Sequence, residues 1–441
     1  MSNEIYIPSR RDFLKGVAIG AGGYAFGSML PHPKEAMARP NEEGYLEKVP
    51  VVESYMKGNW FTYFPDNYRW SAGLIIALGT APWGSSDLGE VDRVGKRLKG
   101  SVGNDEAWFQ EWTCLGEELE TLAKEASSQG RNVTASGFNF RACMYFQTGE
   151  RFRQPKDDKA LDVYRRAITC FKTAAKYVDR PSIEFVEIPY EGGKSLPALF
   201  VKASAEEKGP LPTVIFFDGL DVTKEFCYFW GVRDMVRRGL ACLIVDGPGN
   251  GESIRFRSLK LRYDYEVPAG AAVDYLEGRR DVDAKRIGFM ALSLGGYYAP
   301  RAAAFEKRIK ACVAWGASWD YQAQWKRRIE LAYKTALSVP PDHIKWVLGA
   351  SSTEDVLKKL ENFKLKGVAE RIECPFLMVV GEEDAQVPAE DAQTCFNAVG
   401  AKDKTLRIFT SAEGGSQHCQ NDRLGVAIPY MHDWLAEKLK A

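Results

Sequence analysis

Several features that would assign a function are scarce or missing in this sequence of 441 residues. The 59 Lys and Arg residues balance 59 Asp and Glu residues, so the formal net charge is zero at pH 7. Because nucleic acids and anionic membranes are bound through excess positive charge, this balance argues against both partners. Internal repeats and low-complexity tracts are also absent, and the hydrophobic content is 45%. The composition is therefore that of an ordinary globular protein.

Cysteine pairs with metal-binding or disulfide spacing are lacking as well. The nine cysteines are scattered between Cys114 and Cys419 and form no Cys-x-x-Cys motif. An odd number cannot all pair within the chain, and a chain of this length builds a large core without disulfides. We therefore expect mostly buried thiols that act as small apolar side chains, and no metal site.

The sequence has no apolar run of the about 20 residues that a membrane span needs. The apolar run near the start, residues 16–30, contains five glycines. It follows Ser-Arg-Arg-Asp-Phe-Leu-Lys (residues 9–15) and precedes Ala-Met-Ala (36–38). This order resembles a bacterial twin-arginine export signal, although a membrane anchor or a plain helix is the alternative. We expect residues 1–38 to engage the twin-arginine machinery and to be removed, leaving a folded periplasmic or secreted protein without a membrane span.

The rest of the chain changes its hydrophobic period near residue 181. Apolar residues recur every three or four positions in 106–125, 139–152 and 160–177, which predicts a helical region over 39–180. Beyond it, short apolar runs alternate with helical stretches, which predicts an α/β domain over 181–441 with a mostly parallel sheet covered on both faces. A helical insertion at about 318–368 can cover the carboxyl edge of that sheet. The expected strands are 183–189, 196–202, 213–217, 241–245, 286–290, 311–315, 376–380 and 405–409.

The strongest local motif is Ile-Gly-Phe-Met-Ala-Leu-Ser-Leu-Gly-Gly-Tyr, residues 287–297. An apolar strand stops at Ser293, and the residues two before and two after it are Ala291 and Gly295. Small residues at these positions permit the strained strand-to-helix turn, the nucleophile elbow, that exposes a serine hydroxyl. Ala replaces the first Gly of the G-x-S-x-G pattern. The motif predicts Ser293 as a nucleophile.

A serine nucleophile needs a general base, and the sequence contains only four histidines. His418 lies in a Gly-rich loop after the last expected strand, which suits a base at the sheet edge. His32 lies in the export signal, His343 in the helical insertion, and His432 in the C-terminal helix. We therefore predict His418 as the base.

The base in turn needs a carboxylate to fix its tautomer and stabilise the imidazolium. The expected strand at 376–380 is followed by Gly-Glu-Glu-Asp, in which Asp384 is the leading candidate ahead of Glu382 and Glu383. The order Ser293, Asp384, His418 matches that of α/β-hydrolases. Three strand ends therefore predict one catalytic triad.

The oxyanion hole is expected to combine the backbone N–H of Leu294 with that of Gly219 or Leu220, in the loop after the first central strand. Asp218, Asp221 and Glu225 of that loop are expected to cap or pair near the following helix. The segment Asp-Gly-Pro-Gly-Asn-Gly-Glu-Ser (246–253) lacks the Lys-Ser/Thr ending of a phosphate-binding loop, so it predicts a turn before the cleft.

Five segments together carry a family resemblance: Arg-Ala-Cys-Met-Tyr-Phe-Gln (141–147), Ile-Pro-Tyr-Glu-Gly-Gly (188–193), Phe-Asp-Gly-Leu-Asp-Val-Thr-Lys-Glu (217–225), the segment 246–253 and the Ser293 turn. The chain resembles the 2,6-dihydroxypseudooxynicotine hydrolase group of α/β-hydrolases, related to the fungal yellowish-green pigment hydrolases that shorten polyketide chains. The resemblance covers roughly residues 60–440. It implies hydrolysis of a carbon–carbon bond next to a ketone by Ser, Asp and His beneath a helical cap, without cofactor or metal.

Within that implied cap, we expect Arg141, Tyr145 or Phe146 to approach the cleft and contact a small aromatic or polyketide-like substrate. The scissile bond stays open between a ketone or β-diketone C–C bond and an ester. A general carboxylesterase or an exported acyl-peptide or dipeptidyl-type serine peptidase is the enzymatic alternative, and a non-catalytic binding module is the other. The oligomeric state also stays open, with a homodimer as one option.

Overall fold

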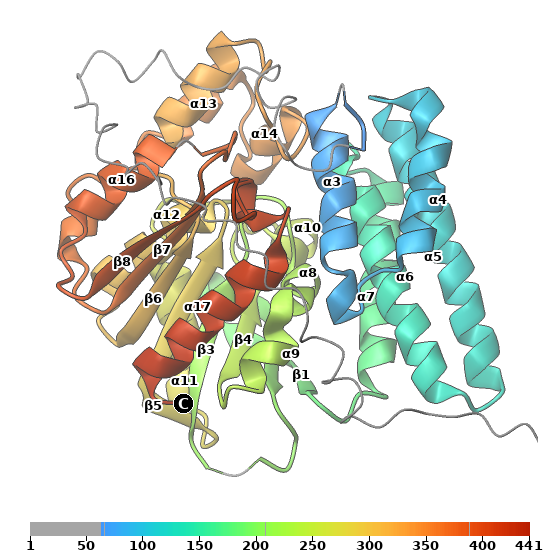
Figure 1. Cartoon of the computed structure of the whole chain (residues 1–441), viewed down its shortest axis with the longest axis horizontal. Coiled ribbons are helices and arrows are strands. Elements are labelled where there is room, and N and C mark those ends of the chain that lie inside the picture. Colours follow the sequence, from blue (N-terminus) through green and yellow to red (C-terminus); the bar gives the residue numbers. More distant parts are fainter. Residues whose placement is uncertain (1–62, 66, 208, 388) are drawn as a thin grey trace, which may run out of the picture. The chain divides into compact units, whose positions relative to one another are not determined.

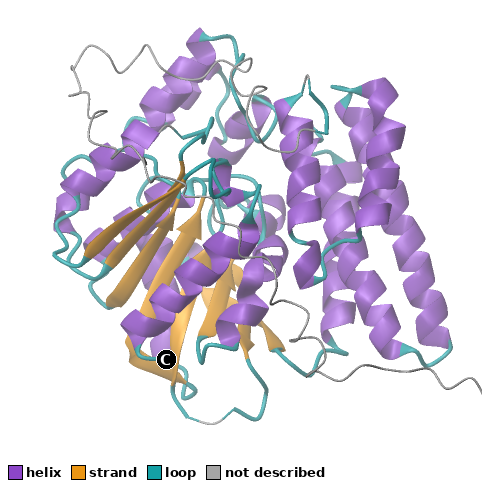
Figure 2. Cartoon of the chain, in the orientation of Figure 1, coloured by secondary structure: helices purple, strands orange, loops and turns teal. Residues whose placement is uncertain are grey.

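Eight strands build one sheet in the order β1-β2-β4-β3-β5-β6-β7-β8. The structure, a computed structural model, describes residues 63–441 except 66, 208 and 388, so the expected export signal lies outside the described residues. Figures 1 and 2 show helices on both faces of the sheet, which defines an α/β-hydrolase fold and confirms the predicted class. The strands are β1 (Ser182–Pro189), β2 (Ser195–Lys202), β3 (Leu211–Phe217), β4 (Ala241–Val245), β5 (Val282–Leu292), β6 (Ile309–Trp315), β7 (Phe376–Gly381) and β8 (Lys404–Phe409).

The central strands are parallel and buried on both faces. β3 pairs with β4 and β5, and β5, β6, β7 and β8 pair in sequence, all parallel, whereas β1 and β2 are antiparallel additions. Burial on both faces explains why the inner strands are largely continuous apolar runs in the sequence, whereas the edge strand β8 is only partly buried. Because parallel strands end at one edge, the loops after β3, β5, β6 and β7 meet there.

The helices of the described residues fall into three groups by position in the chain. One group precedes the sheet, a second lies between its other strands or after the last one, and a third lies between β6 and β7. Their bounds are α3 (Tyr68–Gly79), α4 (Leu88–Leu98), α5 (Asp105–Ser128), α6 (Asn132–Phe152) and α7 (Asp158–Ala175); α8 (Lys224–Cys227), α9 (Arg233–Val236), α10 (Gly251–Arg257), α11 (Glu266–Glu277), α12 (Gly295–Phe305), α16 (Ala389–Ala398) and α17 (Leu424–Leu439); and α13 (Tyr321–Glu330), α14 (Asp342–Leu348) and α15 (Thr353–Lys359).

The helices before the sheet form where the sequence predicted them, with clear start signals. The side chains of Asn104 and Asp157 accept hydrogen bonds from the first turns of α5 and α7, as expected of N-caps. The apolar stripe of α5 is buried at Trp108, Trp112 and Leu119. Amphipathic helices of this kind gain stability by burying that stripe against a neighbouring element.

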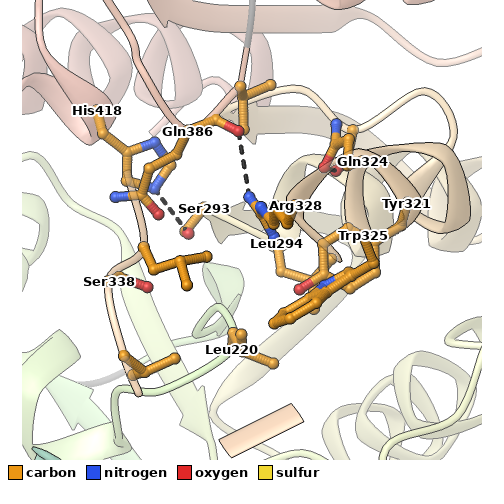
Figure 3. A pocket seen from close by; sticks show the side chains of 14 residues that line it. Leu220, Ser293, Leu294, Tyr321, Gln324, Trp325, Arg328, Ser338, Gln386 and His418 are labelled. Carbon is orange, nitrogen blue, oxygen red and sulfur yellow. Dashed lines mark hydrogen bonds between the residues drawn. The ribbon is translucent and has the colours of Figure 1, made fainter. Parts of the chain in front are cut away.

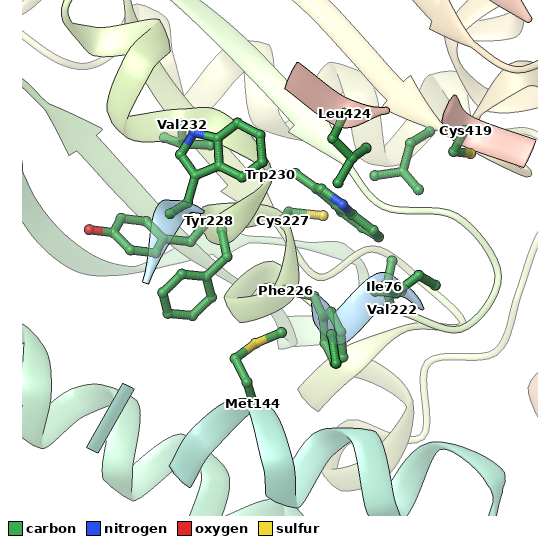
Figure 4. Packing of buried hydrophobic residues seen from close by; sticks show 14 of the residues in the cluster. Ile76, Met144, Val222, Phe226, Cys227, Tyr228, Trp230, Val232, Cys419 and Leu424 are labelled. Atoms are coloured by element: carbon green, nitrogen blue, oxygen red, sulfur yellow. The ribbon is translucent and has the colours of Figure 1, made fainter. Parts of the chain in front are cut away.

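An apolar cluster joins these helices to the α/β domain. Ile76 of α3 and Met144 of α6 belong to the same buried cluster as Val222, Phe226 and Trp230, which follow β3 (Figure 4). Burial of such side chains stabilises by about 1.5–3 kcal/mol each. The N-terminal helices therefore share a core with the segment that follows the first central strand.

Buried ion pairs also connect α6 to the α/β domain. Arg151 donates from Nε to Asp221 at 2.8 Å, and both side chains are 5% exposed. Glu150 accepts from Arg255 of α10 at 2.6 Å, and Gln147 donates to Glu225 at 3.2 Å. Through these contacts, side chains of α6 hold the loop after β3 and the start of α10 in place.

The segment between β6 and β7 is the expected helical insertion. It contains α13, α14 and α15, and Asp320 caps α13 by accepting a hydrogen bond from the Ala323 N–H at 2.9 Å.

Among the helices that the structure describes, none combines the length and the apolar content of a membrane-crossing segment.

Candidate active site

Ser293 occupies a strained turn between β5 and α12. Its φ is +60°, a left-handed value that non-glycine residues rarely adopt. Its N–H donates to the Trp315 carbonyl at 2.8 Å, which ties the turn to the end of β6. A Cβ on Gly295 would lie 2.5 Å from the Ala291 Cβ. The small residues around Ser293 are therefore required by the close packing of the turn.

A chain of two hydrogen bonds runs from Ser293 into the loops after β7 and β8. The Ser293 Oγ lies 2.8 Å from His418 Nε2, and His418 Nδ1 lies 2.7 Å from Asp384 Oδ2. The other Asp384 oxygen accepts the N–H groups of Gln386 and Val387 at 2.8 and 3.0 Å. With Nδ1–H donating to the carboxylate, Nε2 is free to accept the serine proton.

The electrostatics of His418 follow from its carboxylate partner. Burial by itself lowers the pKa of an imidazole, but the Asp384 carboxylate outweighs it and raises the pKa of His418 well above 6.5. Glu383, a lesser candidate for this role, instead accepts from Ser416 and Gln417, and Glu382 accepts from the Ser411 N–H. Asp384 is thus the acid of this loop that contacts the imidazole.

The expected oxyanion residues border the same serine. A Cβ on Gly219 would lie 2.7 Å from the Ser293 Cβ and 2.8 Å from the Leu292 carbonyl oxygen, so only glycine fits there. Among the described residues, no hydrogen bond takes up the N–H of Leu294 or Leu220. Both residues line the pocket beside Ser293, where their free N–H groups can stabilise an oxyanion.

The loop after β3, residues 218–223, carries the expected oxyanion donors and is called the oxyanion loop; two side chains that the sequence did not point to hold it in place. Asn250 donates to the Gly219 carbonyl at 2.7 Å, and His343 Nε2 lies 3.3 Å from the Leu220 carbonyl oxygen. Burial lowers the pKa of His343 to about 3, so its neutral imidazole donates that bond. Nothing in the sequence around His343 links it to a loop 123 residues earlier. His432 is buried within α17, away from the pocket lining.

Of the three acidic residues in and after the oxyanion loop, two form ion pairs, as expected, and the third does not. Asp221 pairs with Arg151, and Glu225 pairs with Lys224 at 2.7 Å. Asp218 is fully buried, and neither of its carboxylate oxygens has a hydrogen-bond partner in the described part of the chain. Burial, with Asp246 and Asp221 nearby, raises the pKa of Asp218 well above its usual value. A neutral carboxylic acid is the form that tolerates this position.

A pocket opens beside Ser293, and side chains of the insertion line much of it (Figure 3). Its volume is about 20 Å³, room for roughly one water molecule, so lining side chains must move to admit a substrate. The sequence predicted that the insertion covers this edge but named none of its side chains. The lining residues are Leu220, Ser293, Leu294, Ser318, Tyr321, Gln324, Trp325, Arg328, Leu337, Ser338, Val339, Gln386, Val387 and His418.

The expectation that Arg141, Tyr145 or Phe146 approaches the cleft is wrong for this structure. Arg141 donates to Glu90 of α4 at 2.9 Å, and the Tyr145 hydroxyl donates to the same carboxylate at 2.6 Å. The Phe146 ring packs against Gly116 of α5. These three residues join helices of the N-terminal region to each other, and none of them lines the pocket. Tyr68 of α3 comes nearer, since its hydroxyl accepts from the pocket residue Gln386 at 2.7 Å.

The fold and the serine at the elbow define the chain as an α/β-hydrolase. The family described as "Esterase FrsA-like" matches residues 97–438. The chain therefore belongs to the FrsA-like esterase family.

Several relatives cover more than four fifths of this chain. Hydrolase LUC6 of Fusarium sp is 31% identical over 412 residues, which cover 85% of this chain and 97% of that protein. The 20-hydroxy-prefusarin hydrolase FUS2 of Gibberella moniliformis is 29% identical over 400 residues, covering 82% and 94%. The solved structure of 2,6-dihydroxy-pseudo-oxynicotine hydrolase superposes with a TM-score of 0.68 at 25% identity, covering 82% and 95%. These similarities support the group to which the sequence motifs pointed.

Proposed function

We propose that this protein is a serine hydrolase that cleaves a small carbonyl compound through Ser293, His418 and Asp384. The observation that carries the proposal is the continuous hydrogen-bonded chain from the Ser293 hydroxyl through His418 to Asp384, at the wall of a pocket. A serine in a left-handed turn, a base on its hydroxyl and an acid on the base together meet the geometric requirements for an activated nucleophile.

The acylation step follows from the positions of these groups. The Ser293 oxygen attacks the substrate carbonyl while His418 Nε2 takes the hydroxyl proton, and Asp384 stabilises the imidazolium. The N–H groups of Leu294 and of Leu220 or Gly219 stabilise the oxyanion of the tetrahedral intermediate. The imidazolium then donates its proton to the departing group, which leaves an acyl group on Ser293.

The departing group distinguishes an esterase from a C–C hydrolase. An ester releases an alkoxide, whereas a ketone or β-diketone releases a carbanion that must be protonated as it forms. Water, activated by His418, then hydrolyses the acyl-enzyme and regenerates Ser293. Relatives named as a prefusarin hydrolase and a pseudo-oxynicotine hydrolase support a small ketone-containing substrate. We therefore place ketone or ester hydrolysis of a small aromatic or polyketide-like compound first.

The proposal can be tested by assaying the purified protein on three sets of substrates. These are aryl esters, β-diketones with acylphenols, and aminoacyl anilides. We expect turnover of the first or second set, together with labelling of Ser293 by a fluorophosphonate. Turnover confined to anilides would favour a peptidase. No turnover and no label would contradict a serine hydrolase.

The pH dependence of kcat/KM is expected to follow the neutral form of His418. Because Asp384 raises the pKa of His418, activity should rise with pH through a midpoint above 6.5. The ion pair between His418 and Asp384 contributes to the free energy of unfolding with the opposite trend. This contribution is complete below about pH 6.5, and it is lost as the pH rises through the pKa of His418 in the folded protein. Asp384→Asn should lower the midpoint and reduce kcat by about 10⁴. A pH–rate profile with an unchanged midpoint in that variant would contradict this coupling.

We also propose that residues 1–38 direct export of the folded protein by the twin-arginine route. The support is the Arg10-Arg11 pair followed by a Gly-interrupted apolar run. Changing Arg10-Arg11 to Lys-Lys keeps the charge but removes the pair that the receptor recognises, so precursor should accumulate in the cytoplasm. Fractionation followed by immunoblotting measures this, and normal export of the variant would overturn the proposal.

A further inference from the structure

One buried arginine of the pocket lacks the carboxylate partner that other buried arginines have. Arg151 and Arg301 are 5% and 9% exposed and pair with Asp221 and Glu266. Arg328 of α13 is also 9% exposed, yet it forms no ion pair with any described residue. A nearly buried guanidinium without a counter-ion is energetically costly, so binding of an anion at this position is favourable.

The protein holds the Arg328 guanidinium in place with neutral groups. Nη2 donates to the Gln386 carbonyl at 3.3 Å, and the guanidinium carbon lies 5.0 Å from the ring centroid of Trp325. This aromatic contact supports the planar group, and no carboxylate of the described residues accepts a hydrogen bond from its fork. Figure 3 shows Arg328 among the side chains of the pocket that contains Ser293 and His418.

Two acids beside this pocket bond other groups. Asp384 bonds His418, and Asp391 accepts from Gln324 at 2.8 Å. Burial raises the pKa of Asp391 to about 7, which weakens it as a source of negative charge. Gln324 in turn accepts from Ser318 at 3.0 Å, so the pocket wall around Arg328 is built of neutral polar groups.

We propose that Arg328 binds a carboxylate of the substrate and makes the enzyme selective for anionic esters or ketones. The inference rests on the proposed serine hydrolase function and specifies its substrate class. A carboxylate accepts two parallel hydrogen bonds from a guanidinium fork, which adds orientation to charge. Arg328 and Ser293 line one small pocket, so a bound carboxylate places the reacting carbonyl of the same molecule beside the nucleophile.

Two matched substrate pairs test the proposal on the full protein. One pair is 4-acetoxybenzoate and its neutral methyl ester, with the charge on the departing group. The other is 4-nitrophenyl hydrogen adipate and 4-nitrophenyl hexanoate, with the charge on the acyl group. In at least one pair, the kcat/KM ratio of anionic to neutral substrate should fall by about 10- to 100-fold in Arg328→Gln, mainly through KM. Arg328→Lys should retain part of the preference.

The matched control is Lys326→Gln, which removes one positive charge from an exposed position of the same helix. Its ratio should equal that of the unchanged protein. Because Arg328→Gln can fail to fold, the unchanged protein is also inhibited with benzoate and with benzamide during hydrolysis of 4-nitrophenyl acetate. Benzoate should inhibit at least about tenfold more strongly.

The outcomes separate this inference from the function on which it rests. If the unchanged protein hydrolyses neither member of either pair and takes no fluorophosphonate label, the proposed function itself fails. If it hydrolyses the neutral esters but the ratios are unaltered in Arg328→Gln, carboxylate binding is overturned and the hydrolase stands. Equal losses on neutral and anionic substrates show that Arg328 only supports the Gln386 loop, and they overturn the proposal, as does equal inhibition by benzoate and benzamide.

Discussion

Ser293→Ala is expected to lower kcat by about 10⁶, close to the loss of the whole triad's contribution, while the fold is retained. The substitution removes only the hydroxyl that bonds His418. The strained φ of +60° is equally costly for serine and alanine, so the turn keeps its conformation. Measuring kcat on the best substrate together with the thermal unfolding midpoint separates chemistry from folding.

Ser136→Ala is the matched control for this experiment. Ser136 is also a buried serine, but its hydroxyl donates to the Ala174 carbonyl at 2.9 Å within the N-terminal helices. We expect near-normal turnover and normal fluorophosphonate labelling in this variant, and no label in Ser293→Ala. Turnover by Ser293→Ala within about tenfold of the unchanged protein would refute its role as nucleophile.

The strands and the residues at their ends were accessible from the sequence because each depends on a local pattern. Continuous apolar runs are the signature of strands buried on both faces, and all eight expected strands are present. Ser293 and Asp384 each follow such a strand, His418 follows the partly buried edge strand β8, and the parallel topology brings the three residues into hydrogen-bond contact. Ser293 could also be predicted from its own neighbours, because the tight turn requires small residues at positions 291 and 295, which are Ala291 and Gly295.

The pocket wall was not accessible in the same way because it depends on how distant segments pack. Arg141 and Tyr145 sit in an aromatic-rich helix that suggested a substrate face, but both bond Glu90 of another helix. Arg328 sits in an amphipathic helix, and what distinguishes it is that no carboxylate among the described residues forms an ion pair with it. The contacts of His343 and Asn250 with the oxyanion loop are likewise made between segments that no local pattern connects.

The second large effect is expected at the ion pair between α6 and the oxyanion loop. Arg151→Met leaves the Asp221 carboxylate buried without its partner, which should lower the free energy of unfolding by about 3–5 kcal/mol. The double variant Arg151→Met with Asp221→Leu removes both charges and should recover much of that loss. Urea denaturation followed by tryptophan fluorescence measures both. Arg165→Met, which breaks an exposed pair with Asp162, should cost less than about 1 kcal/mol.

This pair also tests what the N-terminal helices contribute to catalysis. Asp221 directly follows Leu220, which lines the pocket, and Gly219 lies close against the Ser293 turn. Loosening Asp221 should displace these donors, and losing one oxyanion donor costs about 10²–10³ in kcat. We therefore expect Arg151→Met to lower kcat while KM changes little, even under conditions where the variant is fully folded. A folded Arg151→Met with unchanged kcat would show that the helices stabilise the domain without positioning its oxyanion loop.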